Sequence, residues 1–408
     1  MKRLLIVLGL CAVLAAALPV PAVADTSVTV ISTGAEAVFP TSITFRLEAE
    51  SQAEVADIDL EYSVRAMTVV PVICRVDVDF TPGETVSTSW TWDMLETGGL
   101  PPGTAVDYVW VIEDASGQVT RSDPSSVAFD DQRHDWNSIT RGNVTLLWYQ
   151  GDSEFAQGLM DTAHEALERL ANDIGVSLEQ AAELYIYANS QDLREALVYP
   201  QEWTGGVAFT DYGIIAIGIA PAQVEWGQRA ISHELGHLVV HQAVHGPFGD
   251  LPTWLDEGLA MDAEGKLRSD LQARLDQGIA SDTLFSVRSI CSSFPSDPHE
   301  AKLCYGQSYS VVQFLLDTYG RAKLLELLEK FKQGSTCNDA LQQIYGFDLD
   351  GLNAAWRESV GLPAEQPPHP TNGGTAMPGY SVAVIAITAA LGLLFVYLLL
   401  RRVVFRAR

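Results

Sequence analysis

The segment HELGH at residues 233–237 constrains this chain most, because it places two histidines four residues apart. In an α-helix this spacing puts the imidazoles of His233 and His237 on one face, one turn apart, so that both can bind the same metal ion. Glu234 lies between them, where its carboxylate can take a proton from a metal-bound water. The flanking residues 224–246 are mostly apolar and contain no proline, as expected of a buried helix.

A second segment, WLDEGLA at residues 254–260, follows at a distance that allows a second helix to pack antiparallel to the first. Its Glu257 supplies a third protein ligand. Two histidines, one glutamate and one position open to water form a catalytic zinc arrangement. The residues therefore predict one Zn2+ ion held by His233, His237 and Glu257, with Glu234 as the general base. The alternative is a structural helix with two incidental histidines.

Together these segments resemble the gluzincin zinc metallopeptidases, and most closely the small bacterial peptidase MA-like domains. Two further segments carry the likeness, GGVAF at residues 205–209 before the helix and YGQSY at residues 305–309 after it. The resemblance covers about residues 140–360. It implies a zincin-like α+β fold, hydrolysis of peptide bonds, zinc at the three ligands named above and Glu234 as the base.

One departure from the family bears on the substrate. Aminopeptidases of this clan carry a G-x-M-E-N loop whose glutamate holds the free α-amine of the substrate. The corresponding residues 205–210 read GGVAFT and contain no acidic residue. The sequence therefore favours an endopeptidase, with Glu202 and Glu225 as the candidate anchors if the protein is an aminopeptidase. A rival from another class is a catalytically inactive surface adhesion or sensor protein, against which the intact Glu234 argues.

Peptide hydrolysis needs a second electrophile, besides the metal, for the developing oxyanion. Tyr309 is the candidate, because it lies in the segment that is expected to open a helix after the site. Tyr305 and His241 compete for this role, and simple packing is the alternative for Tyr309. Asp256 is expected to orient a ligand histidine, to cap its helix or to face solvent.

The chain begins with a predicted secretory signal peptide over residues 1–24. Two basic residues precede an apolar run at residues 4–18, and Ala-Val-Ala at residues 22–24 forms an A-x-A cleavage site. Cys11 offers the alternative of a lipoprotein signal, although the apolar stretch before it is short. We therefore expect the mature protein to be exported.

A second apolar run, residues 380–400, contains no charged residue. A helix of that length spans about 31 Å, enough to cross the hydrocarbon core of a bilayer. Four arginines follow in residues 401–408, and basic residues favour the cytoplasmic side. The sequence predicts a single-pass cell-membrane protein with an extracellular catalytic domain and a cytoplasmic tail. Residues 361–379 are rich in proline and glycine and are expected to form a linker.

The formal net charge of −27 at pH 7 argues against nucleic acid as a partner, because phosphate binding needs a basic surface. The expected partners are a peptide or protein substrate and, through the C-terminal helix, the membrane.

Four cysteines follow the signal segment, at positions 74, 291, 304 and 337. In an oxidising exterior they are expected to pair, and three connectivities exist. Cys291 and Cys304 bracket a loop rich in serine and proline and form the favoured bridge, with two free thiols as the alternative.

The region between these ends divides into two parts. Residues 25–132 contain short alternating runs separated by proline and glycine turns, which predicts an all-β sandwich similar in architecture to immunoglobulin or fibronectin type III modules. Residues 138–360 begin with strands, including a hairpin over 207–217, and continue with helices. This order is typical of an α+β domain. Helices are expected over residues 153–171, 307–319 and 321–332, among others.

Overall fold

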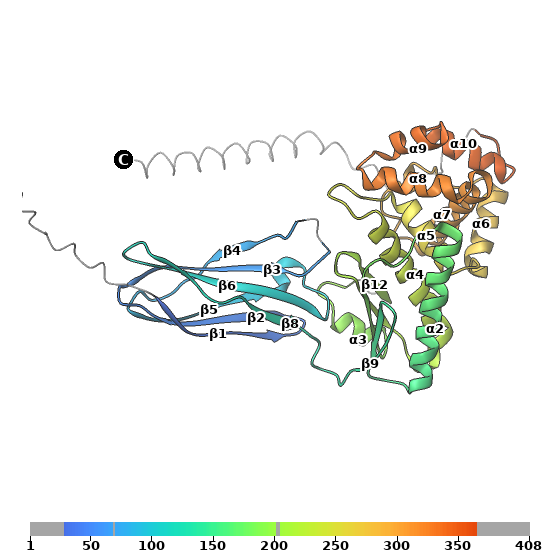
Figure 1. Cartoon of the computed structure of the whole chain (residues 1–408). Coiled ribbons are helices and arrows are strands. Elements are labelled where there is room, and N and C mark those ends of the chain that lie inside the picture. The colour runs from blue at the N-terminus through green and yellow to red at the C-terminus, as the bar shows by residue number, and fades with distance from the viewer. Residues whose placement is uncertain (1–27, 68–69, 201–204, 365–408) are drawn as a thin grey trace, which may run out of the picture.

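The computed structural model describes residues 28–67, 70–200 and 205–364. They form a β-rich part, drawn in blue to cyan in Figure 1, and a second part that combines a mixed sheet with helices. Within these ranges no helix is both long and apolar enough to cross a membrane. The predicted signal peptide, the predicted span at residues 380–400 and the basic tail lie outside the described residues.

The β-rich part consists of two antiparallel sheets. One has the order β1-β2-β5, with bounds Thr29–Val38, Ser42–Glu50 and Thr85–Asp93. The other has the order β4-β3-β6-β7, and β8 also pairs with β6. Its strands are β3 (Val55–Val64), β4 (Cys74–Asp77), β6 (Thr104–Asp114), β7 (Val119–Arg121) and β8 (Ser125–Phe129). In β2, every second side chain from Ile43 to Ala49 is buried, which is the alternation of a strand with one covered face.

The second part is built on a five-stranded sheet in the order β12-β13-β11-β10-β9. Its strands are β9 (Asn137–Arg141), β10 (Val144–Trp148), β11 (Ala182–Tyr187), β12 (Gly206–Phe209) and β13 (Ile214–Gly218). The three central strands are parallel, and the two outer strands run antiparallel to their neighbours. The predicted hairpin is confirmed as β12 and β13, and β12 forms the edge of the sheet.

The two faces of this sheet are covered by different parts of the molecule. Leu184 and Ile186 pack on one face with α2 (Ser153–Arg169) and α4 (Val224–Ala243). Tyr187 points to the opposite face and belongs to the core of the β-rich part. In Figure 1 the sheet accordingly lies between the sandwich and these helices. The two parts of the chain therefore share one hydrophobic core.

The remaining helices follow α4 along the chain. They are α5 (Thr253–Ala263), α6 (Ser269–Ser281), α7 (Pro298–Tyr319), α8 (Arg321–Lys332), α9 (Cys337–Tyr345) and α10 (Leu349–Ser359), while the short α1 (Met94–Thr97) and α3 (Ser190–Glu195) precede α4. The predictions for residues 153–171 and 321–332 are close to α2 and α8. The prediction that α7 begins at residue 307 is wrong by more than two turns.

The N-terminal cap explains where α7 begins. The Asp297 carboxylate accepts hydrogen bonds from the backbone N–H groups of His299 and Glu300, at 2.9 and 3.0 Å. Pro298 stands at the first helical position, where a missing N–H costs nothing. The segment expected to be a loop thus contains the start signal of the longest helix near the site.

Two glycines allow the central helices to approach closely. A Cβ atom added to Gly236 on α4 would lie 2.7 Å from the Cα atom of Ala260 on α5. A Cβ atom added to Gly258 on α5 would lie 2.7 Å from the backbone oxygen of Ser308 on α7. Only glycine fits at both positions, so α5 packs tightly between α4 and α7.

Candidate metal centre

Helix α4 supplies the first half of the site. His233 and His237 lie one turn apart, and their Nε2 atoms are 3.2 Å from each other. Their ring planes are nearly perpendicular, with centroids 4.8 Å apart. Both nitrogens therefore face one small space on the surface of α4, as the spacing in the sequence predicts.

Helix α5 brings the third residue to the same space. The Oε2 atom of Glu257 lies 3.3 Å from Nε2 of His233 and 3.6 Å from Nε2 of His237. This approach depends on Gly236, because α5 crosses α4 at that glycine. The three side chains form the one metal-ligand cluster found among the described residues.

The geometry of these three atoms fits a zinc ion. Four tetrahedral ligands at the usual zinc distances of about 2.0–2.1 Å are about 3.3 Å from one another. The three separations here are 3.2, 3.3 and 3.6 Å. Within the described part of the chain, the buried Oε2 atom of Glu257 also lacks a well-formed hydrogen bond. Two imidazoles and one carboxylate with a fourth position free are the donor set of a catalytic zinc site.

Two further carboxylates orient the imidazoles from behind. Nδ1 of His237 lies 2.9 Å from Asp256, and Nδ1 of His233 lies 2.9 Å from Glu264. Because an ionised carboxylate only accepts hydrogen bonds, each Nδ1 keeps its proton, and Nε2 is the nitrogen of each imidazole that is available to a metal ion. Asp256 therefore orients a ligand. Glu264 was missed from the sequence, although its position seven residues after Glu257 places it on the same face of α5.

The charges of the cluster show that it attracts a cation. Burial opposes protonation of His233, but Glu257 and Glu264 outweigh burial and raise the pKa of its imidazole to about 9. His237 is likewise buried, and Asp256 and Glu257 raise its pKa well above the ordinary value. Burial would raise the pKa of Glu257, but the two histidines lower it to about 2. Without a metal ion, protons on the imidazoles supply the positive charge that these carboxylates require.

Glu234 lies at the edge of this cluster, beneath strand β12. Burial raises the pKa of its carboxyl group, and the backbone N–H of Ala208 acts in the opposite sense as a hydrogen-bond donor. A Cβ atom on Gly206 would lie 2.8 Å from Oε1 of Glu234. The glycine at this position is therefore what lets the edge strand pass directly over the carboxylate. A raised pKa suits a group that must alternately accept and release a proton.

The structure does not bring Tyr309 to this cluster. Burial raises its pKa, and the charges that add to this effect are those of Asp262 and Asp317, not those of the site. Tyr305 is the tyrosine that lies beside the metal ligands. Its ring centroid is 6.4 Å from that of His233, and its pKa is raised by burial first and then by the charges of Glu257 and Glu234. Both tyrosines belong to α7, one turn apart, and the turn nearer the start of the helix is the one that lies beside His233.

His241, a candidate for the group that binds the oxyanion, contacts a carboxylate behind the metal ligands. Its Nε2 atom lies 3.2 Å from Oδ2 of Asp256, whose Oδ1 atom contacts His237. Glu225, a candidate amine anchor, is exposed and pairs with Arg229 at 3.2 Å. The other candidate anchor, Glu202, lies outside the described residues.

The cysteines do not form the predicted bridge. Cys291 and Cys304 are both free thiols. Cys304 is buried within α7, whereas Cys291 lies next to Cys337, and the hydrogen bond between these two side chains lowers the pKa of the Cys291 thiol. The prediction of a Cys291–Cys304 pair is wrong, because it took the start of α7 for a loop.

Comparison with known proteins agrees with this geometry. Residues 162–361 match the family model of the Peptidase MA superfamily. No curated protein matches the chain in sequence.

Among solved structures, the M1 zinc metallopeptidase from Deinococcus radiodurans is 13% identical, with 82% of this chain and 93% of that chain covered and a TM-score of 0.30. Legionella pneumophila aminopeptidase A in complex with aspartic acid is 11% identical, with 81% and 49% covered and a TM-score of 0.38. A carbohydrate-binding module of family 56 is 13% identical over 25% of this chain and 98% of that chain, with a TM-score of 0.15.

These TM-scores are low, so the family match and the ligand geometry together carry the assignment. The match includes all three metal ligands, the glutamate between the two histidines and the helices that position them. Residues 162–361 thus form a gluzincin-like zinc metallopeptidase domain of the Peptidase MA superfamily, and a β-rich N-terminal region precedes it.

Proposed function

We propose that this protein is an endopeptidase that uses one zinc ion and cleaves extracellular peptides or proteins close to a membrane. The observation that supports internal cleavage is the strand β12. Among the described strands it pairs only with β13, so that its other edge is open beside Glu234, and its four residues, Gly206–Phe209, include no carboxylate that would hold a terminal amine. An extended peptide can add to such an edge and continue past the site in both directions.

Each residue of the site has a separate role in the proposed hydrolysis. Zinc bound by His233, His237 and Glu257 would lower the pKa of a bound water and polarise the scissile carbonyl. Glu234 accepts a proton from the attacking water and passes it to the departing amine. The Tyr305 hydroxyl, whose raised pKa keeps it protonated, donates a hydrogen bond to the oxyanion.

The proposed location rests on the sequence. Residues 380–400 would anchor the chain in the membrane, with the peptidase domain outside and the arginine-rich tail in the cytoplasm. The acidic composition suits an exported domain that does not bind nucleic acid.

Cleavage of a peptide blocked at both ends tests the proposal. We expect the zinc-loaded full chain to cut such a peptide internally, as identified by mass spectrometry of the products, and to lose this activity on addition of a chelator. Glu234→Gln should lower kcat at least a hundredfold, because the general base is gone.

Glu225→Gln is the matched control, since it makes the same change on an exposed position of the same helix. It should cleave the blocked peptide at the wild-type rate. Removal of single residues from a free amino terminus, with blocked peptides left intact, would instead identify an aminopeptidase.

A further inference from the structure

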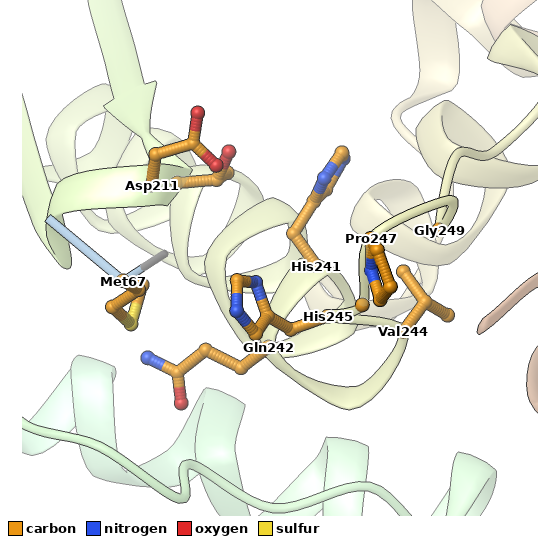
Figure 2. A pocket seen from close by; sticks show the side chains of 10 residues that line it. Met67, Asp211, His241, Gln242, Val244, His245, Pro247 and Gly249 are labelled. Carbon is orange, nitrogen blue, oxygen red and sulfur yellow. The ribbon is translucent and has the colours of Figure 1, made fainter. Parts of the chain in front are cut away.

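A cavity of about 260 Å³ lies at the C-terminal end of α4. Figure 2 shows His241 and His245 of this end, with Asp211 and Met67 across from them. Asp211 belongs to the turn between β12 and β13, and Met67 reaches in from the β-rich part. The backbone N–H of Met67 donates to the carbonyl oxygen of Asp211 at 2.5 Å, so this wall is built from both parts of the chain.

Two side-chain contacts link the wall of the cavity to the metal centre. His241, which lines it, contacts Asp256, and Asp256 contacts the ligand His237. On its other side the cavity begins where strand β12 ends, because Thr210 and Asp211 follow Phe209. A peptide lying along the free edge of β12 would therefore reach this cavity on one side of the catalytic glutamate.

The direction of the peptide decides which side this is. An antiparallel ladder is the more stable way to add a strand to an edge. Strand β12 passes Glu234 at Gly206 and runs from there toward Phe209. A peptide antiparallel to β12 therefore has its amino-terminal half near Phe209 and Asp211. The cavity lies on the amino-terminal side of the scissile bond.

The charges around the cavity favour a cation. Asp211 is exposed, and among the described residues it forms no ion pair, while none of the described lining residues is a lysine or an arginine. The last backbone carbonyl groups of α4 add the negative end of a helix dipole. A positively charged substrate group would meet a carboxylate and helix carbonyls there, and no described lysine or arginine lines the cavity.

The cavity also offers an unused donor. Gln242 is only 8% exposed, and its Oε1 atom accepts hydrogen bonds from the N–H groups of Glu179 and Gln180, both at 3.0 Å. Its Nε2 atom is buried and has no hydrogen-bond partner within the described residues. A buried donor without a partner is unfavourable by itself, so a small local rearrangement that brings it to a carbonyl oxygen of a bound peptide would be favoured.

We propose that this cavity is a substrate subsite, built around Asp211 and Gln242, that selects a positively charged residue on the amino-terminal side of the cleaved bond. This inference rests on the proposed peptidase function and names its substrate class: peptides and proteins with lysine or arginine before the scissile bond. A free terminal amine carries the same charge and is the other source of a cation.

Three matched fluorogenic peptides distinguish these sources with the zinc-loaded full chain. One is acetylated and neutral, one is acetylated with a single lysine before the cleaved bond, and one is neutral with a free amine. We expect kcat/KM for the lysine peptide to exceed that for the neutral blocked peptide about fivefold, as for a partly exposed ion pair, and to fall with added salt. Asp211→Asn should remove this preference, so that the lysine peptide and the neutral blocked peptide are cleaved with equal kcat/KM.

Asp135→Asn is the control, because it removes a carboxylate from an exposed loop outside the cavity. It should retain the preference for lysine. The inference is overturned if Asp211→Asn keeps the preference, if the wild-type chain shows none, or if only the free amine is preferred.

Equilibrium binding separates this inference from the proposed function. Fluorescence anisotropy of the labelled peptides with Glu234→Gln measures binding without turnover. We expect about fivefold tighter binding of the lysine peptide, lost in the double variant with Asp211→Asn. Selective binding without any cleavage by the wild-type chain would retain the subsite and reject the peptidase reaction. Equal binding of all three peptides would reject the subsite.

Discussion

Two carboxylates that do not bind the metal determine how the ligand imidazoles are held. Asp256 and Glu264 each accept a hydrogen bond from a histidine Nδ1 atom at 2.9 Å, Asp256 from His237 and Glu264 from His233. The ligands themselves follow from the spacing of residues on helices, so the sequence is sufficient to predict them. Glu264 lies at the very end of α5, where a sequence does not show whether the helix continues. The sequence likewise does not show how α7 is oriented, and this orientation decides whether Tyr305 or Tyr309 lies beside the ligands.

Asp256→Asn and Glu264→Gln should each weaken zinc binding about tenfold, because loss of a carboxylate partner makes the imidazole a poorer and less well oriented ligand. Competition with a chromophoric chelator at pH 7.5 measures this change. Asp250→Asn, in the exposed loop before α5, should bind zinc as the wild type does. Unchanged affinity in both test variants would show that the ligands are held by packing alone.

Zinc binding should also depend strongly on pH. The metal-free chain holds a proton on His233 below a pKa of about 9, and zinc must displace this proton. A ligand that must lose a proton binds more tightly as the pH rises, by about tenfold per pH unit for each proton, until the pKa is passed. Affinities at pH 6.5, 7.5 and 8.5 should therefore increase in that order. An indicator dye should detect at least one proton released per zinc ion at pH 7.5, and its absence would contradict the protonated cluster.

At the scale of elements, the site depends on how closely α4, α5 and α7 approach one another. The two close approaches occur at Gly236 and Gly258, where an added Cβ would meet backbone atoms that cannot move alone. Each glycine lies inside one of the two sequence motifs that carry the metal ligands. The start of α7 could not be found by periodicity, since its first turn has no buried apolar side chain. Its capping pair of Asp297 and Pro298 was the available signal.

Gly236→Ala should destabilise the fold by about 1–3 kcal/mol, because the added methyl group forces α4 and α5 apart. It should also weaken zinc binding, since Glu257 lies on the helix that is displaced. Gly158→Ala on α2 is the control: no atom lies within 4 Å of its added Cβ, and alanine favours a helix by up to about 1 kcal/mol. Urea unfolding measures both. Equal effects of the two changes would mean that the close contact does not limit the packing.

At the scale of the whole molecule, the β-rich part and the peptidase sheet form one hydrophobic core. Strand β11 explains this arrangement, because its alternate residues Leu184 and Ile186 face the helices while Tyr185 and Tyr187 face the sandwich. The sequence shows that both faces of this strand are apolar, but not which segment covers each face. For that reason the sequence predicts two consecutive parts and not their shared core. The cavity that Met67 and Asp211 close together is a consequence of this contact.

A shared core predicts that both parts unfold together. Calorimetry of the full chain should show a single transition for residues 28–364, because separation would expose Tyr187 and its neighbours. Ile58→Ala, in the fully buried core of the sandwich, should lower the stability by roughly 2–5 kcal/mol. It should lower the temperature of zinc release equally, although it lies far from the ligands. Leu327→Ala in α8, at the opposite end of the molecule, should move the same transition. The alternative outcome is two transitions, with Ile58→Ala shifting only one of them and leaving the temperature of zinc release unchanged. That result would show that the sandwich is an independent module.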